Sequence, residues 1–318
     1  IGAGAVGARA VRQLVESPDV TRVLVVDEDP ARQAAVVETS GPKAREADRD
    51  ASADVVLIAG PSGTHLPDAR LHLGAGRPVV STSDSIEDVR ALLDLDAEAQ
   101  ARSVPVVAGA AFSPGLSCLL ARHAALQLDE VTEVHVARSG TGGPACARQH
   151  HEALTGQGLD WRDGGWQRRP AGSGRELCFF PDPVGGEDCY RAEVPDSLLL
   201  VPVFPGVERV TARLAATRRD RLSAHLPMLR PPHPEGLVGA TRVEVRGRLD
   251  GVSTTVVLGA LDRPAVAAGA VAALAVRRAA TGALPPGAGG LGRLDDCTAA
   301  LHELAAVGIK AAVFEGGL

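Results

Sequence analysis

The chain has 318 residues, a net charge of −6 and 45% hydrophobic residues, which is the composition of a globular protein long enough for two domains. Its acidic balance, with no basic stripe and only 3% aromatic residues, argues against nucleic acid as a partner. The longest apolar stretch, Ala265–Val276, is alanine-rich and too short to span a bilayer, so it predicts a buried helix and no membrane partner.

The chain opens on a glycine motif, Gly2-Ala3-Gly4-Ala5-Val6-Gly7, followed by an amphipathic helix pattern. Such a loop turns tightly, lets the backbone approach a pyrophosphate, and aims free helical N–H groups at the phosphates. Twenty positions after Gly7, the apolar run from Arg22 ends at Asp27, where a carboxylate can accept hydrogen bonds from ribose hydroxyls. The pairing predicts a dinucleotide site; the alternative is an ordinary strand-turn-helix with a surface aspartate.

Asp27 should repel a 2′-phosphate, which favours NAD as the cofactor, although the nearby Arg32 leaves NADP possible. In this fold several apolar residues precede the first glycine as a central strand, and here only Ile1 does. We therefore expect the sequence to lack the first few residues of that strand. The expected cofactor-binding residues are Gly2, Gly4, Ala5, Val6, Gly7, Asp27, Ala59, Gly60, Pro61 and Thr82.

Short apolar runs then alternate with helix-length segments, as a parallel doubly wound sheet requires. The expected strands are Arg22–Asp27, Asp54–Ala59, Pro78–Ser81 and Val104–Ala108, and the expected helices are Thr64–Gly74 and Ile86–Arg102. Small residues at 59–62 follow one strand, at the carboxyl edge of the sheet where ligands bind in such folds. The fold class is therefore α/β, of Rossmann type.

After residue 108 the pattern changes. Ser113 is expected to cap, and Pro114 to begin, a helix that runs through Leu116–Leu126. Strands are expected at 133–138, 209–214, 241–246 and 252–259, the last two as a hairpin, with irregular loops over 140–195. The terminal helix and strand, 295–314, should pack back on the first domain. We expect residues 1–112 and 262–318 to form the dinucleotide-binding domain, and 113–261 an inserted α+β domain, with an antiparallel sheet, for substrate binding and dimerisation.

The loops of the second domain supply candidate catalytic groups. Histidine titrates near neutrality, so His150 or His151 could be a general acid, with Tyr190 as a secondary proton donor. Arginine binds carboxylates through its planar fork, which makes an amino-acid-like, carboxylate-bearing substrate the expected partner. The arginines proposed for this role are Arg148, Arg175, Arg191 and Arg219. Each of these residues could equally be a surface group or an ion-paired structural one.

The five cysteines are odd in number, widely spaced and without a C-x-x-C pair, which indicates reduced thiols and a cytoplasmic location. Cys146, with His150 and His151, and Cys178 or Cys189 have the atom types for zinc. Their spacing is not that of a compact ligand motif, so no metal is expected.

Four segments together resemble the saccharopine dehydrogenase-type (saccharopine reductase-like) oxidoreductases: the opening GAGAVG, the strand end 77–83, the turn 109–115 and the closing 308–316. The resemblance implies a nucleotide-binding domain, an inserted α+β domain and a returning C-terminal segment. It also implies hydride transfer between a nicotinamide and a C–N bond of an amino-acid derivative. We expect the protein to be a homodimer.

Two alternatives stay open. The sugar-oxidising Gfo/Idh/MocA dehydrogenases share the first domain, but they usually place a catalytic Glu-Lys-Pro where this chain has Thr82-Ser83-Asp84. The chain could also be a dinucleotide-binding sensor without turnover.

Overall fold

The computed structural model describes residues 1–228 and 236–314, so residues 315 and 316 of the closing motif lie outside the described part. A four-stranded parallel sheet has the order β14-β5-β4-β3. Its strands are β3 (Val56–Ile58), β4 (Val79–Ser81), β5 (Pro105–Val107) and β14 (Gly287–Gly289). A separate parallel pair is formed by β1 (Val23–Val25) and β2 (Ala44–Glu46). The expected parallel α/β sheet is confirmed.

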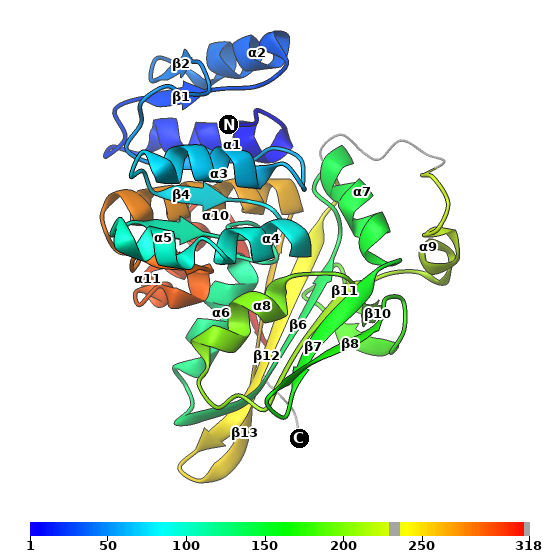
Figure 1. Ribbon diagram of the computed structural model, residues 1–318. Helices are drawn as coiled ribbons and strands as arrows, with labels where there is room; N and C mark the ends of the chain where they lie inside the picture. Colours follow the sequence, from blue (N-terminus) through cyan, green and yellow to red (C-terminus); the bar gives the residue numbers. More distant parts are fainter. Residues whose placement is uncertain (229–235, 315–318) are drawn as a thin grey trace.

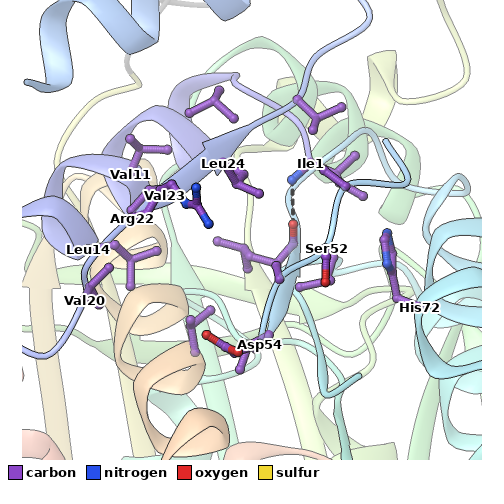
Figure 2. A pocket seen from close by; sticks show the side chains of 18 of the residues that line it. Ile1, Val11, Leu14, Val20, Arg22, Val23, Leu24, Ser52, Asp54 and His72 are labelled. Atoms are coloured by element: carbon purple, nitrogen blue, oxygen red, sulfur yellow. Dashed lines mark hydrogen bonds between the residues drawn. The ribbon is translucent and has the colours of Figure 1, made fainter. Parts of the chain in front are cut away.

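Ile1 and Gly2 join the strand pair to the four-stranded sheet. The amino group of Ile1 donates to the Leu57 carbonyl oxygen at 2.7 Å, and the Gly2 N–H donates to the Val26 carbonyl oxygen at 2.8 Å. Beside Ile1, a cavity of about 430 Å³ lies between β1 and β3. Figure 2 shows side chains that line it. The two residues thus place the glycine loop between the two strands.

Helices cover both faces of the parallel sheet (Figure 1). Helices α3 (His65–Gly74), α4 (Ile86–Leu93) and α5 (Asp96–Ala101) lie on the front face in this view, and α10 (Pro264–Ala280) lies behind it. The alanine-rich α10 is buried as predicted, and it packs along α1 (Ala5–Glu16), while α2 (Pro30–Ser40) covers the strand pair. The single helix expected over 86–102 is two helices, which meet at Asp94 and Leu95. None of the helices built from described residues is both long and apolar enough to cross a bilayer.

The second sheet has nine strands, in the order β15-β13-β12-β6-β11-β10-β9, with a β7-β8 hairpin attached to β11. Its pairs are antiparallel except for β6 with β11, so the expected antiparallel sheet is mixed at that place. The strands are β6 (Glu130–Ser139), β7 (Gln157–Arg162), β8 (Gly165–Pro170), β9 (Glu176–Phe179), β10 (Gly186–Arg191), β11 (Arg209–Ala215), β12 (Gly239–Leu249), β13 (Val252–Asp262) and β15 (Lys310–Phe314).

One continuous core joins the two sheets. Helix α6 (Leu116–Ala125) lies between β12 and α11 (Cys297–Ala306), and buried residues such as Val80, Leu119 and Val243 belong to the same cluster. Helix α8 (Asp196–Leu200), followed by the short η1 (Val201–Val203), also packs on α6. The small η2 (Leu291–Arg293) follows β14 and touches α6 as well. The two sheets therefore share one hydrophobic interior.

Three local expectations are wrong. Residues 140–195 are not irregular: they hold α7 (Pro144–Ala153) and the strands β7 to β10. Strand β15 pairs with β13 in the large sheet and not with the first domain, because the long β13 exposes a free edge there. Ser113 does not cap α6: Gly115 is its N-cap, at a φ of 120°, and the Ser113 hydroxyl donates to Asp196 at 2.7 Å instead.

Candidate functional site

A cleft of about 370 Å³ lies at the carboxyl ends of β3 and β4, between the glycine loop and the large sheet. From the parallel-sheet side its lining includes the glycine loop, Asp27, residues 59–62 and residues 82–84. From the other side it includes residues 111–113, Arg138 and the start of α7. The cleft thus has the position at which ligands bind in doubly wound folds.

The glycine loop is packed so closely, against the end of β3 and against itself, that two of its positions exclude a side chain. A Cβ on Gly2, whose φ is +92°, would lie 2.6 Å from the Ala59 carbonyl carbon, and one on Gly7 would collide with the Gly2 carbonyl oxygen. Gly4 differs, because a Cβ there would meet nothing within 4 Å. Gly4 is the N-cap of α1 and has no side-chain cap, so the first N–H groups of the helix are open to the cleft.

Asp27 is anchored by backbone groups at the end of β1. Its Oδ2 accepts from the Ala3 N–H at 2.6 Å, and its Oδ1 accepts from the Asp29 N–H at 2.9 Å. Arg32, which is half exposed, lies 3.4 Å from Oδ1. The carboxylate is 8% exposed, and each oxygen keeps a lone pair for a further donor in the cleft.

A buried hydrogen-bond chain behind the cleft fixes the two strand-end loops. His65 is fully buried, with Nε2 3.0 Å from the Gly60 carbonyl oxygen and Nδ1 2.8 Å from Ser81 Oγ. A carbonyl only accepts, so Nε2 carries the proton and Ser81 donates to Nδ1. Ser81 Oγ also accepts from the Ser83 N–H at 3.2 Å. Burial lowers the pKa of His65, which favours the neutral ring and with it this arrangement of hydrogen-bond donors and acceptors.

Arg138, at the end of β6, is a buried positive charge in the lining of the cleft, with its side chain 8% exposed. Its Nη1 donates to Asp84 at 2.9 Å and to the Ser113 carbonyl oxygen at 2.5 Å. Burial disfavours the charged guanidinium, but Asp84, with smaller contributions from Cys146 and Asp196, outweighs this in sum and raises the pKa of Arg138. Its Nε and Nη2 have no hydrogen-bond partner among the described residues.

Cys146, in the first turn of α7, lines the cleft beside Arg138. Burial, with the negative charge of Asp84, raises the pKa of its thiol to about 11. The thiol therefore stays protonated at neutral pH, and it is not an activated nucleophile.

The expected cofactor residues are brought together. All of them line the cleft except Gly7, which packs beneath the loop against Gly2. Among the expected substrate arginines, Arg148 lines the cleft. The other three lie elsewhere: Arg175 pairs with Asp188 at 2.9 Å, Arg191 pairs with Asp160 at 3.1 Å, and Arg219 is exposed on α9 (Arg218–Ser223).

The proton-donor candidates are also outside the cleft lining. His150 is half-buried, and burial together with the positive charge of Arg138 lowers its pKa to about 4. His151 Nε2 donates to the Leu226 carbonyl oxygen at 2.8 Å. Tyr190 is buried, with the Arg221 guanidinium 4.1 Å above its ring. The catalytic roles of these three residues stay predictions.

Arg138 and Asp84 were not among the site residues that the sequence predicted. A signal for Arg138 exists, because it follows Val134 and Val136 at the two-residue period of a strand, on the face that is buried. A charge on that face needs a partner or a ligand. No group of three metal-ligating side chains comes together anywhere in 1–228 or 236–314.

The comparisons with known proteins bear on the fold. No protein-family model matches the chain, and no curated protein matches its sequence. Among solved structures, it is similar to apo saccharopine dehydrogenase (L-Glu forming) from Saccharomyces cerevisiae, with a TM-score of 0.70 and 16% identity over 99% of this chain and 98% of that one. It is also similar to an amine dehydrogenase from Mycobacterium smegmatis, with a TM-score of 0.53 and 11% identity over 92% and 94%. The resemblance in the sequence is thus confirmed for the fold: this chain has the two-domain fold of saccharopine dehydrogenase.

Proposed function

We propose that the protein is an NAD(P)-dependent oxidoreductase that transfers a hydride between a nicotinamide and an amino-acid-derived imine or amine. The observation that carries the proposal is which residues line one cleft. The uncapped α1 N-terminus, the glycine loop and Asp27 line it from one side, and the buried Arg138 lines it from the other.

The nucleotide side fits a dinucleotide. The open space over Gly4 leaves room for a pyrophosphate against the first N–H groups of α1, whose dipole favours an anion. Asp27 has lone pairs for the ribose hydroxyls, and its charge repels a 2′-phosphate. NAD is therefore the proposed cofactor, and Arg32 is the residue that would contact a 2′-phosphate if NADP bound.

The substrate side fits a carboxylate-bearing compound. When bound, a nicotinamide gives or accepts a hydride at ring carbon C4. Arg138 and Arg148 supply positive charge in the lining of the cleft. The solved structures of similar fold include enzymes named for saccharopine and for an amine, which supports substrates with a C–N bond.

The same proposal includes a cytoplasmic location and a homodimer. The five cysteines are free thiols, which is compatible with the cytoplasm. Leu177 and Phe179 are 58% and 60% exposed on β9, at one end of the large sheet. Exposed apolar side chains on an edge strand are typical of an interface, which supports a homodimer.

Turnover tests the proposal. NADH or NADPH is mixed with a panel of 2-oxo acids and amines, and the reduced-nicotinamide absorbance is followed. We expect faster consumption of NADH than of NADPH with at least one pair, and a smaller difference in the Asp27→Ala variant because the repelling charge is gone. Glu28→Gln is the control, since Glu28 is 88% exposed and outside the cleft lining. Nucleotide binding without consumption across the panel would contradict an enzyme and favour a sensor.

A further inference from the structure

We propose that Arg138 and the first turn of α7 form a subsite that binds a carboxylate group of the substrate, on the large-sheet side of the cleft. The identity of the ligand as a substrate rests on the proposed function; the subsite itself rests on the two features described next.

The first feature is the free edge of the Arg138 guanidinium. Nη1 is committed to Asp84 and the Ser113 carbonyl, which holds the side chain in place. The unpartnered Nε and Nη2 are neighbours on one edge of the planar group, and their spacing matches the two oxygens of a carboxylate. Buried donors of a charged group are costly to leave without acceptors, so this edge is poised for an anionic ligand.

The second feature is the N-terminus of α7, a helix of ten residues. Gly143 is its N-cap and has no side-chain cap, and residues 142–146 line the same cavity as Arg138. Pro144 has no N–H, so the free amides of the first turn belong to Ala145 and Cys146. The positive end of the helix dipole therefore lies at the same cleft that Arg138 lines.

The charge around the subsite favours an anion. Asp84 lies on the opposite edge of Arg138, and its charge is paired there. Arg148 adds a second positive charge to the lining. Asp196 is the other buried carboxyl in reach of Arg138, and burial raises its pKa, which favours its neutral form. Asp196 Oδ1 already accepts from Ser113 and Ser117, and no hydrogen bond joins Asp196 Oδ2 to the unpartnered Nε and Nη2 of Arg138.

Calorimetric titration of the NADH-saturated protein with malonate tests the subsite, with malonamide as the neutral probe of similar shape. Saturation with NADH covers the glycine loop, which could otherwise take up the anion. The test variant is Arg138→Lys, which keeps the charge beside Asp84 and loses the bidentate edge, and Arg138→Gln is the second variant. The control is Arg213→Lys, because Arg213 is equally buried on β11 but is bonded to Asp160 and lies outside the cleft lining.

We expect the unmodified protein to bind malonate and not malonamide, and Arg138→Lys to weaken malonate binding by about tenfold or more, since a charged bidentate contact is lost. Arg213→Lys should bind malonate as the unmodified protein does. If NADH binds but malonate does not, or if Arg138→Lys binds it equally well, the subsite is wrong and the proposed function stands. If NADH itself does not bind, the proposed function fails, and the same titration without nucleotide decides the subsite alone.

Discussion

His150 makes the stability of the fold depend on pH. Its pKa is about 4 in the folded protein against 6.5 for the ordinary group, because burial and Arg138 disfavour the charged ring more than Asp220 favours it. As pH falls below about 6.5, the unfolded chain takes up a proton that the folded chain refuses until about pH 4. The stabilisation from the neutral ring is therefore full above that window and is lost as pH falls through it.

The His150→Gln variant tests this. We expect its free energy of unfolding to fall less between pH 7 and pH 4 than that of the unmodified protein, by on the order of 2 kcal/mol, a value discounted for the partial exposure of the ring. Urea unfolding at a series of pH values measures it. His302→Gln is the control, because His302 is exposed on α11. An equal pH dependence in the two variants would contradict the buried, neutral ring.

Single residues were predictable from the sequence where backbone geometry alone decides their role. Gly2 and Gly4 reach the cleft because a short glycine loop between a strand and a helix has few conformations. Arg175 and Arg191 were chosen by residue type, and their carboxylate partners, Asp188 and Asp160, come from other strands. Such pairings depend on strand register, which residue type does not reveal.

At the scale of elements, the contact of α1 with α10 positions the glycine loop. A Cβ on Gly269 of α10 would lie 2.6 Å from Arg9 Cβ and 2.9 Å from the Ala10 nitrogen of α1. We expect Gly269→Ala to push the helices apart, to destabilise the fold by about 1–3 kcal/mol, and to weaken NADH binding. Urea unfolding and calorimetry measure the two effects. Gly74→Ala is the control, because a Cβ there meets nothing within 4 Å; equal stability of the two variants would show that the helix contact is looser than described.

The elements of the parallel sheet were predictable because each is one apolar run between turn signals. The short strands over 157–191 were not, since arginine and glycine interrupt their alternation. One signal was present: Asp163-Gly164, both at positive φ, forms the turn between β7 and β8, and such a pair is typical of a tight hairpin.

For the whole molecule, the α/β class and a second sheet built mainly of antiparallel strands follow from alternation and composition, but the parallel pairing of β6 with β11 and the position of the last strand do not. β15 joins the large sheet through β13, an edge that exists only once the hairpin has formed. Because one core links both sheets, the cleft between them has walls that do not depend on a flexible linker. We therefore expect nucleotide binding to occur in a largely preformed site.

The central claim is that the glycine loop binds the diphosphate of NADH, and the most direct measurement is a calorimetric titration with NADH of the unmodified protein and of Gly4→Val. The Cβ of the new side chain meets no protein atom within 4 Å, and the side chain fills the space proposed for the diphosphate; Gly74→Val is the matched control at another open position. We predict that the unmodified protein and Gly74→Val bind NADH alike, and that Gly4→Val, folded normally, binds it about tenfold more weakly or worse. Absence of NADH binding by the unmodified protein, or equal binding by Gly4→Val, would contradict the account.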